Sequence, residues 1–244
     1  MTFLREARLE KEPRTIDGFR LRGAEVTRLE SFSDAVFGFA LTLLVVSLDV
    51  PKSFEELINT MRGFPAFALC FVLLVLIWNR HYVFCRRYGL DDLTTRTLTC
   101  VLLFLVLFYV YPLKFLFYFS FNNLIFGGST SAIRLTVPQV SLLLGIYGLG
   151  FAAVYGALTA LHLHAWRLRE QLGLNELEKF DTCQQIFRLS LLIIIGLIAA
   201  ALAQFRSTLN WSGFCYLLLL PILRMHSVLR RRRRKAFHSK PQSE

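Results

Sequence analysis

The residues best suited to chemistry lie in one apolar stretch near the N-terminus. Ser33 and Asp34 stand at the start of an apolar run that continues to Leu48, and Thr42 lies in its middle. The 19 residues of 32–50 are about as long as the hydrocarbon core of a bilayer is thick. A carboxylate or hydroxyl in such a helix is costly unless it meets a polar partner or an ion. These residues are therefore candidates for ion handling or for polar helix packing.

A helical wheel places three large apolar side chains of this stretch on one narrow face. At about 100° per residue, Phe39, Leu43 and Val46 form a stripe along the helix, with Thr42 at its edge. Asp34 lies about 140° from Phe39 by the same count, so it points toward neighbouring helices rather than along this stripe. The stripe alone is typical of ordinary contacts with other helices or with lipid.

Asp34 is expected to find its partners at the end of the second apolar run of the chain. The polar residues there are Trp78, Asn79 and His81. Arg28 would fall on the stripe side if the helix extended back unbroken, so we expect it to turn away into a network with Asp34. Both expectations give Asp34 a packing role.

No other group of residues indicates catalysis, a metal or a cofactor. His162 and His164 have no carboxylate or cysteine near them in sequence, which favours an interfacial pair beside Trp166 over a metal site. The five cysteines form no CxxC pair and indicate buried thiols rather than a zinc site or a disulfide framework. Walker, GxSxG and HExxH motifs are missing from the sequence, so we expect no enzyme activity and no cofactor.

Composition places the chain among polytopic membrane proteins. Of its 244 residues 55% are hydrophobic, including 23 Phe, and a soluble domain of this length needs fewer. The net charge of +11 sits between apolar runs and at the two tails, not on a basic face with interleaved aromatic residues. The lipid bilayer is therefore the expected partner, and nucleic acid is not.

Six apolar runs are each long enough to cross a membrane. We expect an all-α fold with six transmembrane helices, at 32–50, 64–84, 97–119, 137–161, 185–205 and 211–229. Pro112 should kink the third helix or end it near Tyr111, and residues 122–136 are expected to form a loop. Small residues recur every four positions from Gly148 to Ala160 and predict a close helix contact, within or between subunits.

The tails are expected to lie in the cytosol. Residues 1–27 lack the apolar segment of a signal peptide, and we expect a tail with little order up to about Gly23. If the tails are cytosolic, all but five of the 28 Lys and Arg residues lie on the cytosolic side of the membrane, in the tails and in the loops on the same side. The positive-inside rule then places both termini inside. The second tail, 230–244, begins with a basic run that suits anionic lipid headgroups.

The start of the first apolar run carries a family resemblance. The motif Arg28-x-x-x-Phe32-Ser33-Asp34 leads directly into a transmembrane helix, and five further apolar runs follow. Residues 28–229 thereby resemble the lysosomal potassium channel family of transmembrane protein 175 and its bacterial homologues. Trp78 and His81 are similar to the Trp- and His-rich end of the family's second helix. The motif occurs once, which implies a single-repeat subunit of the bacterial type, in a prokaryotic plasma membrane.

The resemblance implies an architecture and a function. The family forms a central pore from the first helices of its subunits, without a re-entrant pore loop, and a single-repeat chain is expected to be a homotetramer. The sequence has no Thr-Val-Gly-Tyr-Gly filter, as expected for such a pore. Potassium ions are the implied partner, and passive, potassium-selective conduction is the implied activity.

Carried onto this chain, the resemblance assigns roles to the stripe. Phe39 is the implied constriction, Leu43 and Val46 are further apolar layers, and Thr42 is the selectivity hydroxyl. Family members usually carry Ile or Leu where this chain has Phe39, which implies a tighter ring or one gated by its rotamers.

Two other classes of function remain open from the residues. A secondary transporter of a small solute or ion would place its site at helices broken by Pro112 or Pro221. A membrane scaffold without transport is the third possibility.

Overall fold

The computed structural model describes residues 19–23, 25–46, 52–126 and 135–205. These residues form six helices and their connections. Their bounds are α2 (Arg28–Val46), α3 (Phe54–Arg62), α4 (Phe64–Tyr88), α5 (Leu93–Phe126), α6 (Val137–Arg167) and α7 (Glu176–Leu202).

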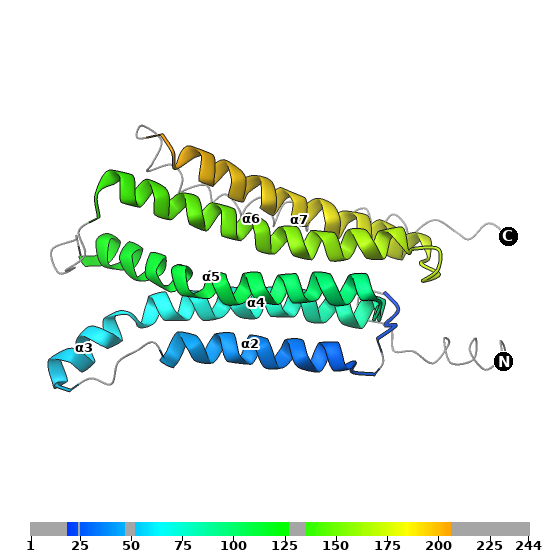
Figure 1. Cartoon of the computed structure of the whole chain (residues 1–244), viewed down its shortest axis with the longest axis horizontal. Coiled ribbons are helices and arrows are strands. Elements are labelled where there is room, and N and C mark those ends of the chain that lie inside the picture. Colours follow the sequence, from blue (N-terminus) through cyan, green and yellow to red (C-terminus); the bar gives the residue numbers. More distant parts are fainter. Residues whose placement is uncertain (1–18, 24, 47–51, 127–134, 206–244) are drawn as a thin grey trace, which may run out of the picture.

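The long helices lie side by side in three layers. Figure 1 shows α2 on one side, α4 and α5 in the middle, and α6 with α7 on the other side. The contacts agree, because α2 packs against α4 and α5, α5 packs against α6, and α6 packs most extensively against α7. Among the described residues, α2 makes no direct helix contact with α6 or α7.

Four of these helices are long and apolar enough to cross a membrane. They are α4, the part of α5 from Leu93 to Val110, α6 and α7. They correspond to the second, third, fourth and fifth predicted spans. The first predicted span, 32–50, overlaps α2 from residue 32 to Val46, and α2 begins earlier, at Arg28. Residues 47–50 and the sixth predicted span, 211–229, lie outside the described residues.

A short helix that the sequence analysis did not predict, α3, precedes α4. Ser53 caps it, because the Ser53 side chain accepts a hydrogen bond of 3.1 Å from the backbone N–H of Glu56. Gly63 ends α3 and begins α4, and Pro65 lies in the first turn of α4, where a proline is well tolerated. The result is a bend between the two helices (Figure 1).

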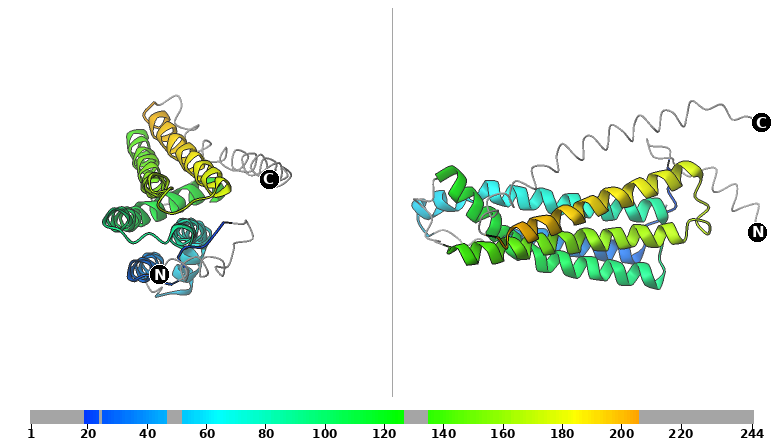
Figure 2. Two further views of the ribbon diagram at one scale, coloured as in Figure 1. Left: turned by 90° about the vertical axis from the view of Figure 1, so that its right-hand side faces the viewer. Right: turned by 90° about the horizontal axis from the view of Figure 1, so that it is seen from above.

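The third predicted span continues well past its proline. α5 runs through Pro112 to Phe126, so the helix does not end near Tyr111, and the predicted loop at 122–136 is wrong at least up to Phe126. Figure 2 shows the distal part of α5 turning away from the direction of its first part. The hydroxyl of Tyr147 on α6 donates a hydrogen bond to the carbonyl of Pro112 and supports this bent segment from the side.

The close packing of α6 against α7 depends on two glycines. A Cβ atom at Gly148 would lie 2.6 Å from the carbonyl oxygen of Gly196 and 2.7 Å from the Cβ of Ala200. The predicted close contact therefore exists at Gly148, and it lies within one chain. Gly156, in the same predicted series, has no atom within 4 Å of where its Cβ would be.

Residues 19–23, just before α2, are packed, so the expectation of little order is wrong for these five residues; residues 1–18 lie outside the described part of the chain. Phe19 is 1% exposed and meets the ring of Tyr88 edge to face, with centroids 5.7 Å apart. The guanidinium of Arg87 lies 4.8 Å from the centroid of the Phe19 ring. The prediction failed because the partners of Phe19 come from α4, which is distant in sequence.

Candidate functional site

The two faces of α2 differ sharply in exposure. One face is buried against α4 and α5 and consists of Ser33, Phe37, Ala40 and Leu44. The opposite face carries Phe39, which is 69% exposed, and Leu43, which is 50% exposed. An exposed apolar patch of this kind is available to lipid or to another protein surface. The side chain of Val46 lies outside the described part of the structure.

Thr42 lies on the exposed face, and its hydroxyl is oriented by its own helix. The Oγ1 atom donates a hydrogen bond of 2.8 Å to the carbonyl oxygen of Phe39. Because a hydroxyl has one donor and two acceptor lone pairs, the lone pairs of Thr42 stay available on this face. An exposed oxygen of this kind can accept a hydrogen bond from water or contact a cation.

Asp34 contacts one of the three partners that the sequence suggested. The indole Nε1 of Trp78 donates a hydrogen bond of 2.7 Å to Oδ1 of Asp34. The Trp78 ring also stacks on Tyr82, with centroids 5.6 Å apart. This contact joins the start of α2 to the second half of α4.

Ser33 and His81 are buried in the layer between the same helices. The Ser33 hydroxyl donates a hydrogen bond of 2.7 Å to the carbonyl of Leu29. His81 is 1% exposed, and its Nε2 lies 3.5 Å from the hydroxyl oxygen of Thr99 on α5. Its ring centroid is 6.2 Å from that of Phe37. His81 therefore links α4 to both α2 and α5.

The charged residues at the start of α2 are arranged differently from the expectation. Arg28 and Phe32 are exposed, and within the described part of the chain no hydrogen bond or ion pair joins Arg28 to Asp34. Glu30, which the sequence analysis did not single out, is buried and lies 3.1 Å from Nη2 of Arg86 on α4. The ion pair near the first turn of α2 is thus Glu30–Arg86.

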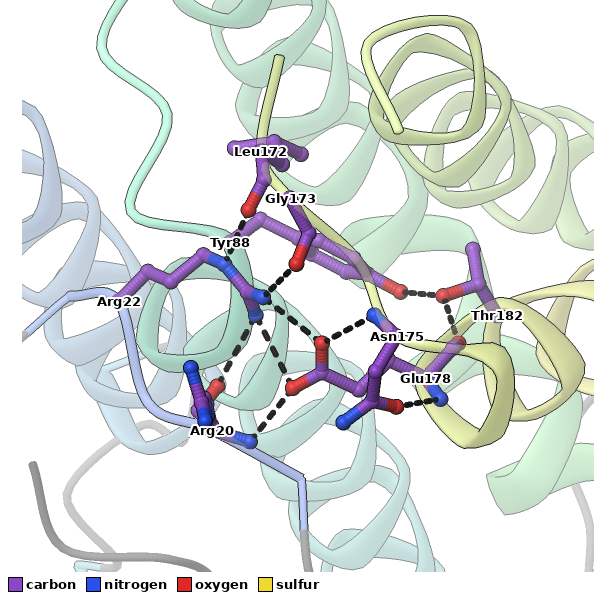
Figure 3. Close-up of polar contacts among 8 residues, drawn as sticks. All are labelled: Arg20, Arg22, Tyr88, Leu172, Gly173, Asn175, Glu178 and Thr182. Atoms are coloured by element: carbon purple, nitrogen blue, oxygen red, sulfur yellow. Dashed lines mark hydrogen bonds and ion pairs between the residues drawn. The ribbon is translucent and has the colours of Figure 1, made fainter. Parts of the chain in front are cut away.

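A second network that sequence reasoning missed lies at the same end of the bundle (Figure 3). Arg22 donates to both carboxylate oxygens of Glu178, at 2.7 and 3.2 Å. Glu178 is the third residue of α7 and forms a capping box with Asn175. The sequence signal for Glu178 is that capping box, whereas nothing in the sequence connects it to Arg22, 156 residues away.

The two histidines near the end of α6 have separate partners. Nε2 of His164 lies 2.8 Å from Oδ2 of Asp92. Partial burial works to raise the pKa of Asp92, but the hydrogen bond from Thr95 and the nearby His164 lower it below the usual 3.8. His162 points its Nδ1 at the carbonyl of Leu158, at 2.8 Å. Within the residues that the structure describes, no group of three or more His, Cys, Asp or Glu side chains is placed to hold a metal ion.

The sequence is similar to that of known potassium channels. The family model described as endosomal/lysosomal potassium channel TMEM175 matches residues 28–112. A potassium channel of Marivirga tractuosa is 38% identical over 219 residues, which cover 84% of this chain and 87% of that protein. A potassium channel of Chamaesiphon minutus is 33% identical over 70 residues, or 25% of this chain and 34% of the other.

Two solved structures are similar to most of this chain. The first is the crystal structure of the potassium channel MtTMEM175, a threonine-to-alanine variant in complex with a nanobody–MBP fusion protein. It has a TM-score of 0.79 and 35% identity, and the match covers 90% of this chain and all of that one. The second is the crystal structure of a lysosomal potassium-selective channel TMEM175 homolog from Chamaesiphon minutus. It has a TM-score of 0.55 and 25% identity, and the match covers 82% of this chain and 96% of the other.

Proposed function

Because the chain belongs to the TMEM175 family of potassium channels, we propose that it conducts potassium ions passively through a central pore lined by α2. Four copies of the chain surround this pore, so that the exposed face of each α2 meets the axis. The chain then crosses the membrane six times, without a re-entrant pore loop. Residues 28–229 form the channel, 1–27 and 230–244 are cytosolic, and the membrane is a prokaryotic plasma membrane.

The observation that carries this proposal is the exposure of Phe39, Leu43 and Thr42. They share one face of α2, while the opposite face packs inside the subunit against α4 and α5. A helix buried on one side and carrying an apolar stripe with a single hydroxyl on the other is suited to line a narrow pore. The strongly similar structure is that of a potassium channel, which supports this use of the face over plain lipid contact.

The roles on this face follow from their chemistry. Rings of Phe39, Leu43 and Val46 side chains form the constriction, and an apolar constriction gates a pore by excluding water. A ring of Thr42 oxygens replaces part of the hydration shell of the potassium ion and contributes selectivity. The Asp34–Trp78 contact, together with buried Ser33 and His81, holds α2 in the rotation that points this stripe at the axis.

The secondary transporter remains the less favoured alternative. The relatives that cover most of the chain are potassium channels. The segment of α5 around Pro112 is helical on both sides, so it does not offer the unwound backbone that a carrier site at this proline needs.

A reversal-potential measurement on the purified protein in a planar bilayer tests the proposal. With unequal mixtures of potassium and sodium on the two sides, a potassium-selective channel gives a current that reverses near the potassium equilibrium potential. A protein that carries no current, or only saturable and coupled uptake into liposomes, is not the channel proposed here.

A further inference from the structure

The segment before α2, residues 19–23, lies between the end of α4, the α6–α7 connection and the start of α7. Gly23 crosses α4 so closely that a Cβ atom on it would be 2.5 Å from the carbonyl oxygen of Cys85. Its amide donates to the carbonyl of Arg86 at 3.1 Å, and its carbonyl accepts from Nη1 of Arg86 at 2.8 Å. Gly89, with a φ of +58°, lets the chain after α4 pass beside Arg22 and Gly23.

Arg22 fixes this segment to the α6–α7 connection (Figure 3). Its five N–H donors are all used. Two reach Glu178, two reach the carbonyls of Leu172 and Gly173, at 2.9 and 3.2 Å, and one reaches the carbonyl of Arg20. The Arg22 side chain is 12% exposed and that of Glu178 is fully buried.

The Glu178 carboxylate is saturated in the same way. Besides the two bonds from Arg22, it accepts from the backbone N–H of Arg20 at 2.8 Å and from that of Asn175 at 3.1 Å. A buried carboxylate with four donors and a bidentate arginine has a defined geometry, and removing one member leaves the other uncompensated. The contact is therefore a rigid fixation point and not a loose surface pair.

Among the described helices, this fixation point connects α2 with a layer, α6 and α7, that it does not contact directly. In the described part of the chain, α2 contacts α4 and α5 but neither α6 nor α7 (Figures 1 and 2). Only four residues separate Gly23 from Arg28, where α2 begins, and an extended chain spans at most about 3.6 Å per residue. Arg86 strengthens the link, because it contacts Gly23 and also Glu30 in the first turn of α2.

We propose that Arg22 and Glu178 are positioning residues for conduction: they hold the intracellular end of α2 and thereby keep the pore open. This inference rests on the proposed function, in which α2 lines the pore. In the proposed pore, the apolar side chains of the four α2 helices are more stable when they contact one another and exclude water. An anchor on the far layer of each subunit opposes that approach, so loosening it favours the closed pore.

Single-channel recording on the full-length protein in a planar bilayer tests the inference. Glu178→Gln and Arg22→Lys should shift the ratio of open to closed time toward closed by between about two- and thirtyfold. The conductance of the open channel and its reversal potential should stay at wild-type values, because no pore-lining side chain is changed. Asp91→Asn, which removes the exposed Asp91–Arg96 pair at the same end of the bundle, is the matched control and should change neither quantity.

A second variant separates coupling from stability. Three glycines inserted between the exposed residues Glu25 and Val26 leave every contact of Arg22 and Glu178 in place, and also the Thr27 oxygen that accepts from the Glu30 amide. The insertion should lower the open fraction as Glu178→Gln does, and the two changes together should add little to either alone. Hydrogen–deuterium exchange of residues 19–23 should stay slow in the insertion variant and become fast in Glu178→Gln.

Several outcomes would overturn the inference. One is a wild-type channel that conducts while Glu178→Gln and the insertion leave the open fraction unchanged or raise it. Another is a loss of open time in Glu178→Gln that the insertion does not reproduce, because the effect would then be one of stability. A wild-type protein without potassium current would remove the proposed function and this inference with it, which distinguishes that failure from the other two.

Discussion

The Trp78 indole donates a hydrogen bond of 2.7 Å to the Asp34 carboxylate and so ties the first helix of the bundle to α4. The carboxylate lies near the start of α2. The indole lies on α4, which packs against the face of α2 opposite to the exposed residues Phe39 and Leu43. A single polar contact at this place opposes rotation of α2 about its own axis. Rotation matters because the exposed stripe and the buried stripe are on opposite sides of one helix.

Replacing the indole by a ring without a donor tests this contact. Trp78→Phe should lower the stability of the protein by about 1 kcal/mol, the usual worth of a hydrogen bond, and should also change potassium flux if the rotation of α2 is set here. Thermal unfolding of the solubilised protein and flux into liposomes measure the two effects. Tyr82→Phe keeps the stack on Trp78 and serves as the control. Equal behaviour of the two variants would argue against a positioning role for the Asp34 contact.

Truncation of the proposed constriction has a matched control on another helix. Phe39 and Phe104 are exposed to nearly the same extent, 69% and 68%, on α2 and α5. Phe39→Ala should raise potassium flux and shorten or abolish closures, since it widens the narrowest apolar ring. Phe104→Ala should leave both unchanged. If the two variants conduct alike, the exposed face of α2 does not line the pore.

The Thr42 hydroxyl is tested by keeping or removing its oxygen. Thr42→Ala should move the reversal potential in mixed potassium and sodium toward that of a non-selective pore, because the ring of oxygens is lost. Thr42→Ser retains a hydroxyl that can donate to the Phe39 carbonyl as that of Thr42 does, and should stay close to wild type. A Thr42→Ala channel with undiminished preference for potassium would assign selectivity to other residues.

The glycines of α6 give a stability prediction with opposite expected signs. Gly148→Ala places a methyl group 2.6 Å from the Gly196 carbonyl, where backbone cannot yield easily, and should destabilise the protein by about 1–3 kcal/mol. Gly156→Ala meets no atom within 4 Å and should be neutral or stabilising by up to about 1 kcal/mol, from helix propensity. Thermal unfolding of both variants in the same detergent makes the comparison. A milder effect at Gly148 than at Gly156 would contradict the packing described for α6 and α7.

Acid sensitivity should depend on Asp92. The pKa of this carboxyl is lower in the folded protein than its usual 3.8, so the charged form stabilises the fold. That contribution is fully present above the usual value and is lost as the pH falls through the lowered pKa. The unfolding temperature of Asp92→Asn should therefore fall less steeply than that of wild type between about pH 5 and pH 2. Identical slopes would show that the contacts of Asp92 with Thr95 and His164 do not contribute.

The sequence by itself determined the membrane character, four of the spans and the face of α2 on which Phe39, Leu43 and Thr42 lie. These properties follow from local periodicity, because a run of apolar residues long enough to cross a bilayer has few other stable conformations. The motif from Arg28 to Asp34 indicated the family from sequence alone, because its residues lie close together in the chain. Sequence also gave Trp78 as a partner of Asp34, as one of three alternatives.

Only the tertiary structure decided which charges meet. Arg22 pairs with Glu178, and Glu30 pairs with Arg86. Neither a helical wheel nor a count of charges indicates which of these residues meet. The persistence of α5 through Pro112 and the burial of Phe19 were decided in the same way, by neighbours that come from distant parts of the chain. A local pattern fixes which face of a helix is apolar, whereas the partner of a buried charge depends on how all the helices pack.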